Sequence, residues 1–151
     1  MALSKQKFRE IVFLLLYSYD FTESFEEASS LIMEELKVTK KSLKEGVEQA
    51  SKVVAHSADI DRFISESSKE YDFQRIPRAE RNILRLGVFE LLFDEQIPDK
   101  VAISESIRLA RKFASFEAAS FANAILDAIR IAKRPPTEEH VSEPNTCLCT
   151  E

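Results

Sequence analysis

Apolar side chains recur at the spacing of an α-helix along most of the chain, and the pattern is plainest between residues 97 and 127. Pro98 separates this segment from the preceding apolar run, because its ring blocks helix continuation. After it, Ile103, Ile107 and Ala110 recur at i, i+4 and i+7, which predicts an amphipathic helix. The opposite face of this helix is charged and consists of Glu105, Arg108, Arg111 and Lys112.

Two more helices are predicted on either side of this segment. Residues 83–93, ILRLGVFELLF, belong to a helix at about 78–94, and another helix begins after Ser115 and ends before Pro135. We expect the inward face of that last helix to consist of Phe121, Ala124, Ile125, Ala128, Ile129 and Ala132.

The N-terminal part of the chain has the same periodicity. It predicts helices at residues 4–19, 25–36, about 39–56 and about 58–71, with Thr39 or Ser42 as the cap of the third. No segment of useful length alternates apolar and polar residues as a half-buried strand does. The pattern therefore predicts an all-α fold of about seven helices, with a joint near residues 57–77.

Length and composition agree with one compact domain. At 151 residues and 44% hydrophobic content, the chain can bury a core. Residues 134–151 are polar and acidic, and we expect a disordered tail there. The tail holds both cysteines, Cys147 and Cys149, so no disulfide staples the core. Together with His140 they lack a fourth zinc ligand, so no metal site is expected.

The first residues resemble a signal peptide, because a basic start precedes the apolar residues 11–17. Against this stand Glu10 beside the run, the shortness of the run and the lack of a small-residue cleavage site. The run is also far shorter than the ~20 residues that cross a membrane. With the unpaired cysteines, these features predict a cytoplasmic protein without a membrane segment.

Charge is distributed unevenly over the chain. The net charge of −5 argues against nucleic acid, but four of the Glu residues lie in the tail. Near the N-terminus, Lys5, Lys7 and Arg9 could form a phosphate-binding arm, in which each contact releases a counterion. The alternative is a solvated helix start. Since cations at a helix N-terminus oppose the helix dipole, the pattern favours a binding role.

Two further groups could contact RNA. Arg78, Arg81 and Arg85 lie at i, i+3 and i+7 on one helix face, where they could follow an RNA backbone. They could equally be solvated or ion-paired. Phe116 and Phe121 bracket the start of the last helix, where free N–H groups bind phosphate and an exposed ring can stack on a base. Core packing is the alternative for both rings.

The sequence contains no Gly-rich phosphate loop, nucleophile elbow or two-metal carboxylate set. It also lacks a cofactor-binding βαβ unit, which argues against a fragment of an enzyme. We therefore expect a protein that is not an enzyme and needs no cofactor.

Three blocks in fixed order resemble the NusB family of transcription antitermination factors. They are ILRLGVFEL, IPDKVAISESIRLARKF and FANAILD, beside the approximate family patterns ILRxAxYEL, IPxKVAINEAIxLAKxFG and FVNGxLD. Residues 9–21 add RE(x)6YSYDF, so the resemblance spans roughly residues 5–130. The departures from the family patterns are Asp99, Ser104, Ala114, Ala122 and Ala124.

The resemblance implies two small helical bundles, about residues 1–56 and 57–133, packed as one unit. It also implies a factor that binds boxA-type RNA of ribosomal RNA leader transcripts together with NusE, within an antitermination complex on RNA polymerase. The expected RNA-binding residues are Lys5, Lys7, Arg9, Arg78, Arg81, Phe116 and Phe121. The expected partner-binding residues are Arg81, Glu105, Arg108 and Arg111. Arg85 and Glu90 belong to the family pattern and are expected to be structural.

The resemblance leaves an alternative open. The family carries an Arg-rich run where this chain has only KQKFR, and the whole chain is acidic. A helical protein-interaction adaptor with weak or lost RNA binding would also fit these features. Steep salt dependence of RNA binding would separate the two, because only phosphate contacts produce it.

Overall fold

The computed structural model describes residues 3–69 and 72–133, and all regular structure in these ranges is helical. The prediction of an all-α fold with about seven helices is confirmed. The elements are α1 (Lys5–Thr22), α2 (Glu26–Leu36), α3 (Lys40–Ala55), α4 (Ser57–Ser67), the short 3₁₀ helix η1 (Phe73–Arg75), α5 (Arg78–Leu92), α6 (Asp99–Phe113) and α7 (Phe116–Lys133). The predicted acidic tail, with Cys147, Cys149 and His140, lies outside the described residues.

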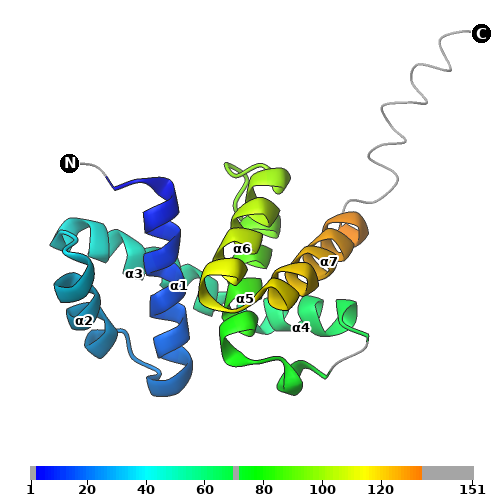
Figure 1. The fold of residues 1–151 in the computed structure, drawn as a ribbon, viewed down its shortest axis with the longest axis horizontal. Coiled ribbons are helices and arrows are strands. Elements are labelled where there is room, and N and C mark those ends of the chain that lie inside the picture. Colours follow the sequence, from blue (N-terminus) through cyan, green and yellow to red (C-terminus); the bar gives the residue numbers. More distant parts are fainter. Residues whose placement is uncertain (1–2, 70–71, 134–151) are drawn as a thin grey trace, which may run out of the picture.

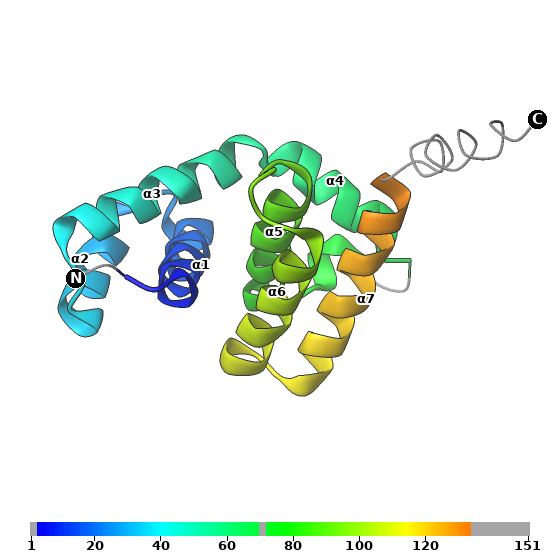
Figure 2. The same cartoon turned by 90° about the horizontal axis from the view of Figure 1, so that it is seen from above.

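Helices α1, α2 and α3 pack together on one side of the molecule, and α4 to α7 pack together on the other (Figures 1 and 2). Helix α5 is central, because it contacts α1, α3, α4, α6 and α7. Buried apolar residues from both groups form one continuous core that includes Ile11, Leu84 and Leu126. No helix in the described ranges has the length and apolar character needed to cross a bilayer.

Local sequence explains where several helices begin and end. Ser4 and Thr39 accept hydrogen bonds from the backbone N–H groups of Lys7 and Ser42, each at 3.1 Å, and so cap α1 and α3. After α1, Glu23 takes a left-handed conformation with φ 58°, and after α2, Lys37 does so with φ 53°. Glycine is the usual residue at such helix ends, since a side chain disfavours this conformation.

The packed face of α7 differs from the prediction. Ile125 and Ile129 are buried as expected, but Ala124, Ala128 and Ala132 are exposed. Ala118, Ala119, Ala122 and Leu126 are buried in their place. Helices α4, α5 and α6 all contact α7, so its buried face is set by three neighbours. Alanine carries too little apolar surface to indicate which of two faces they cover.

Candidate nucleic-acid interface

The three cations at the start of α1 have different environments. Lys5 is exposed and Lys7 is half-buried, whereas Arg9 is only 8% exposed. The Arg9 Nε–H group donates to both carboxylate oxygens of Glu90 in α5, at 3.1 and 3.0 Å. The expectation that all three are surface residues is therefore wrong for Arg9, because its position on α1 faces α5.

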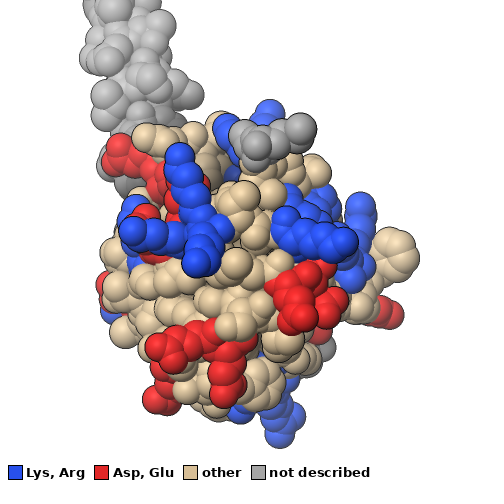
Figure 3. All heavy atoms as spheres, turned by 90° about the vertical axis from the view of Figure 1, so that its left-hand side faces the viewer, with Lys and Arg blue, Asp and Glu red and all other residues tan. Residues whose placement is uncertain are grey.

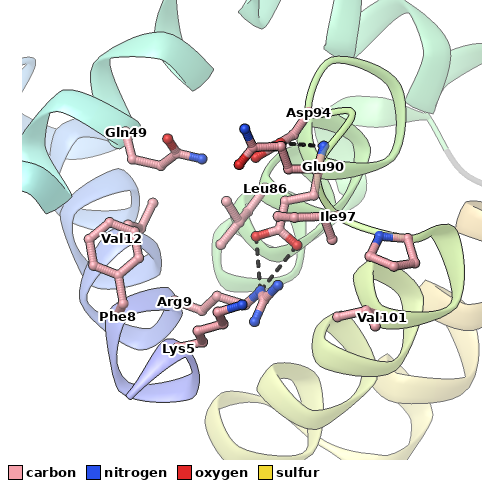
Figure 4. A pocket seen from close by; sticks show the side chains of 12 residues that line it. Lys5, Phe8, Arg9, Val12, Gln49, Leu86, Glu90, Asp94, Ile97 and Val101 are labelled. Atoms are coloured by element: carbon pink, nitrogen blue, oxygen red, sulfur yellow. Dashed lines mark hydrogen bonds and ion pairs between the residues drawn. The ribbon is translucent and has the colours of Figure 1, made fainter. Parts of the chain in front are cut away.

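The ion pair of Arg9 and Glu90 lies at a cleft between the two helical groups (Figure 4). The cleft has a volume of about 370 Å³. Phe8 and Val12 of α1 line one side of it, and Ile97 and Val101 line the other. Lys5 also borders this cleft, so the exposed cation and the buried one lie at the same opening.

The charged face of α6 is turned toward α1 and is not fully solvated. Arg108 donates to Glu105 at 2.9 Å through Nε and to Glu10 at 2.7 Å through Nη1. Lys112 donates to the other oxygen of Glu10 at 3.0 Å, and Arg9 lies 3.8 Å from Glu105. Glu105 and Arg108, which were expected to bind a partner, therefore already hold α6 against α1. Arg111 is exposed and takes no part in this network.

Burial and ion pairing shift the pKa values of Glu90 and Glu10, the two carboxylates discussed here, in opposite directions. Burial raises the pKa of Glu90 to about 7, although Arg9 opposes the shift. Burial also acts to raise the pKa of Glu10, but the hydrogen bonds from Arg108 and Lys112 outweigh it and hold this pKa below its ordinary value. Glu10 is thus a firmly charged partner, whereas Glu90 can take up a proton near neutral pH.

A second network joins the other end of α1 to α4 and α5. Arg85 donates to both oxygens of Asp61, at 2.8 and 3.1 Å, and lies 3.5 Å from Asp20. Asn82 donates to Asp20 at 3.3 Å. The structural role expected of Arg85 and Glu90 is confirmed, since both pair with residues of other helices.

The arginine stripe on α5 is thereby divided into three environments. Arg78 is exposed and lies over the ring of Phe21, 4.5 Å from its centroid, and that ring is 55% exposed. Arg81 is half-buried 5.3 Å from the centroid of Phe73, and its Nε has no hydrogen-bond partner among the described residues. Only the N-terminal part of the stripe is open to a ligand.

The two rings near the start of α7 also differ. Phe116 is 74% exposed, with the Arg111 guanidinium 5.7 Å from its centroid. Phe121 is half-buried and lines a hollow of about 270 Å³ between the starts of α5 and α7, with Pro77 and Glu80. Burial raises the pKa of Glu80. The pairing of Phe116 with Arg111 offers a ring face and a cation together, which is the chemistry of base stacking beside phosphate.

The described residues contain no cluster of His, Cys, Asp and Glu suited to a metal ion. What the surface offers is cations and aromatic rings at three helix starts, those of α1, α5 and α7. This combination suits a polyanion with flat bases.

The chain is similar to known proteins over most of its length. A model of the NusB family matches residues 6–130. The transcription antitermination protein NusB of Geobacter sp. (strain M21) is 37% identical over 138 aligned residues, covering 83% of this chain and 93% of that protein. The protein of the same name from Fervidobacterium nodosum is 35% identical over 141 residues, covering 92% and 97%.

Solved structures agree with these relatives. NusB of T. maritima superposes with a TM-score of 0.76 at 26% identity, covering 93% of this chain and 99% of that one. A chain in a crystal structure of antitermination factors NusB and NusE in complex with dsRNA superposes with a TM-score of 0.74 at 29% identity, covering 85% and 96%. With the family pattern matched from α1 into α7, the chain belongs to the NusB family.

Proposed function

We propose that this chain is a transcription antitermination factor that binds boxA-type RNA of ribosomal RNA leader transcripts together with NusE. The observation that carries the proposal is its similarity, across 85% of its length, to a chain solved with NusE and double-stranded RNA. Its place of action is the cytoplasm, on transcribing RNA polymerase. Its role is binding, without catalysis and without a cofactor.

The proposed RNA surface runs over the helix starts that carry exposed cations and rings. Lys5 and Lys7 contact phosphates, Arg78 and Arg81 follow the backbone, and Phe116 stacks on a base. Phe121 borders this surface from its hollow at the start of α7. Arg9 supports it indirectly, because its pairing with Glu90 holds the start of α1 against α5.

The proposed NusE surface lies on the C-terminal helical group. Among the four residues proposed for the NusE surface, Arg111 is the exposed cation. The other three, Arg81, Glu105 and Arg108, lie at the edges of the surface. A groove between α6 and α7 supports this assignment, since it is lined by Arg108 and Arg111 together with apolar Ile103 and Ile107. Adjacent RNA and NusE surfaces would form one composite site.

Titration of boxA-type RNA with and without saturating NusE tests this mechanism. We expect each ligand to tighten the other by the same factor, typically about 5- to 150-fold. A scrambled RNA of equal length and charge is the control for non-specific phosphate binding. Equal RNA affinity with and without NusE would rule out the cooperative mechanism.

An adaptor that binds protein but not RNA remains the second candidate. The burial of Arg9 favours it, because the arm then offers two open cations in place of three. The two candidates differ in salt dependence. RNA affinity should fall steeply with salt if phosphates are contacted, by about 0.7 log units per contact for each tenfold rise in salt.

A further inference from the structure

The start of α3 carries a cluster of cations that the proposed RNA surface does not include. Residues 37–44, KVTKKSLK, contain four lysines and no Asp or Glu. Lys37, Lys40, Lys41 and Lys44, here called the α3 lysine patch, are all exposed. Within the described part of the chain, none of the four side chains forms an ion pair or a hydrogen bond. Among the described residues, no ion pair or hydrogen bond of these four ammonium groups therefore stabilises the fold.

The α3 lysine patch adjoins the start of α1. Lys41, Ser42 and the acidic Glu45 line a hollow of about 730 Å³ whose other wall is formed by Leu3, Lys5 and Phe8. The two helices cross closely just beyond this point, since a Cβ on Gly46 would lie 3.1 Å from Ile11. The open cation of the α1 arm and the patch thus border one hollow.

Charge is segregated on this side of the molecule. Figure 3 shows Lys and Arg side chains gathered over the upper part of the face, near the N-terminus, and most Asp and Glu side chains below them. The acidic neighbours in sequence, Glu35 and Glu45, are exposed and do not pair with the patch. The upper part of the face therefore presents two groups of basic side chains, separated by uncharged residues, and most of the acidic side chains lie below them.

Helices α1 and α3 also differ from the others in their first turns. The other five α-helices carry Glu26, Glu27, Asp59, Glu80, Asp99 or Glu117 there, whereas α1 and α3 carry lysine and no acid. Lysines at these positions oppose the helix dipoles and repel one another. An anion bound across the two starts would offset both effects.

We propose that the α3 lysine patch binds the phosphates of single-stranded RNA and extends the RNA path that begins at Lys5 and Lys7. The inference rests on the proposed function and adds a second phosphate-binding segment to it. Lysine ammonium groups bind phosphates as point charges and suit contacts independent of base sequence. An RNA strand is favoured over an acidic protein because the patch shares its hollow with Lys5, and a strand can follow both.

Salt titration of a charge-removed variant tests the patch. In the full chain, Lys40→Gln, Lys41→Gln and Lys44→Gln are combined, and binding of a boxA-containing single-stranded RNA is measured from 0.05 to 1 M salt. We expect the log–log salt slope to fall by up to about 2, or about 0.7 for each lost phosphate contact. The affinity difference should shrink toward 1 M salt.

A matched variant controls for net charge. Lys52→Gln, Lys69→Gln and Lys100→Gln remove the same charge from exposed lysines outside the patch. We expect a change in slope of less than 0.3 for this variant. Circular dichroism melting of both variants verifies the fold, and lysine acetylation footprinting of the wild-type chain gives a readout without substitution. RNA should protect Lys40, Lys41 and Lys44 but not Lys52.

The possible outcomes distinguish failure of the proposed role of the α3 lysine patch from failure of the proposed function of the chain. Wild-type RNA binding with an unchanged slope in the patch variant would overturn the inference and leave the proposed function standing. Equal losses in the patch and control variants would overturn it too, because net charge alone would then explain them. Protection of the patch lysines by NusE instead of RNA would assign the patch to protein binding. Absence of RNA binding by the wild-type chain would reject the proposed function itself.

Discussion

At the scale of single residues, Arg9 has more influence on the fold than its place near the N-terminus indicates. Its guanidinium is the partner of Glu90, a carboxylate only 4% exposed. Breaking a buried pair costs about 3–5 kcal/mol. We expect Arg9→Ala to lower the free energy of unfolding by about 3 kcal/mol. This value is at the low end of the range because Glu90 can take up a proton and so lose its unpaired charge.

Urea denaturation at pH 7 measures this effect, and neighbouring substitutions provide the comparison. Lys5→Ala and Lys7→Ala should each change stability by less than about 0.5 kcal/mol, because neither side chain is paired within the described residues. Equal effects of all three substitutions would contradict the internal role of Arg9. RNA binding by the arm is therefore best tested with Lys5 and Lys7 alone.

Glu90 should also make stability depend on pH. Its pKa of about 7 lies above the ordinary glutamate pKa of 4.5, so between these pH values the folded chain binds more protons than the unfolded one. The contribution of Glu90 to stability is complete below pH 4.5 and is lost as pH rises through 7. Each unit of pKa difference corresponds to about 1.4 kcal/mol.

Glu90→Gln removes this titration while keeping a similar shape. Unfolding free energies of the variant and the wild type, compared between pH 4.5 and 8, should diverge, with the wild type losing more stability as pH rises. Glu10 does not confuse the comparison, because its lowered pKa confines its effect to pH values below 4.5. Parallel curves would mean that Glu90 keeps an ordinary pKa.

The buried role of Arg9 could not have been predicted from spacing. Helical periodicity indicates which positions share a face of one helix, but the partner of Arg9 is 81 residues away in α5. The same holds for Arg108, whose carboxylate partner Glu10 is 98 residues away. The sequence therefore predicted a partner-binding role for Glu105 and Arg108 on α6. In the structure these two side chains pair with each other and with residues of α1.

At the scale of elements, sequence periodicity predicted the helices well and their ends less well. Helices α1 to α5 begin within one residue of their predicted starts, and α7 begins directly after Ser115 as predicted. Helix α4 ends at Ser67, short of the expected 71, and α1 continues to Thr22, past the expected 19. The end of α4 lies in the polar stretch 65–69, and Phe21 in the last turn of α1 is exposed, so apolar spacing does not mark the last packed turn of either helix.

Close packing of α5 on α6 and α7 depends on Gly87. A Cβ there would lie 2.4 Å from Ser106 Oγ and 3.0 Å from a Leu126 methyl group. We expect Gly87→Ala to destabilise the chain by up to about 2 kcal/mol, because an overpacking cost of about 1–3 kcal/mol is offset in part by the ~1 kcal/mol that Ala gains in helix propensity.

Gly46→Ala is the matched control for this prediction. Its nearest contact would be a methyl group of Ile11 at 3.1 Å, on a side chain that can adjust. Thermal melting should show a much smaller loss for Gly46→Ala than for Gly87→Ala. Adding Ser106→Ala to Gly87→Ala should restore part of the stability, since it removes the nearest atom. A fully additive double variant would refute the steric explanation.

At the scale of the whole molecule, α1 makes contacts with both groups of packed helices. It packs in the core with α2 and α3, while ion pairs near its two ends join it to α5 and α6. The family resemblance implies two packed bundles, but it does not indicate how charged side chains join them. Substitutions on α6 therefore act on the fold as well as on any partner.

Arg111 is the cleanest probe of the proposed NusE surface for this reason. It is exposed and lies outside the α1–α6 network, so Arg111→Glu should leave melting unchanged within about 0.5 kcal/mol. We expect it to weaken NusE binding by calorimetry, and to weaken RNA binding much more in the presence of NusE than in its absence, where only its place beside Phe116 matters. Arg108→Glu should lower stability as well, because it breaks the pair with Glu10. Unchanged NusE affinity in Arg111→Glu would remove α6 from the interface.

The left-handed residues that end α1 and α2 have a consequence for how far this protein can be stabilised. Glycine at either position would relieve a backbone cost of about 1 kcal/mol. Glu23→Gly should thus raise the melting temperature with RNA affinity unchanged. Lys37→Gly should raise it equally but weaken RNA binding, because it removes one charge of the α3 lysine patch. At position 37, selection for heat resistance would then favour glycine, whereas selection for tight RNA binding would favour lysine. At position 23 the two selections would not conflict, because glycine there leaves RNA affinity unchanged.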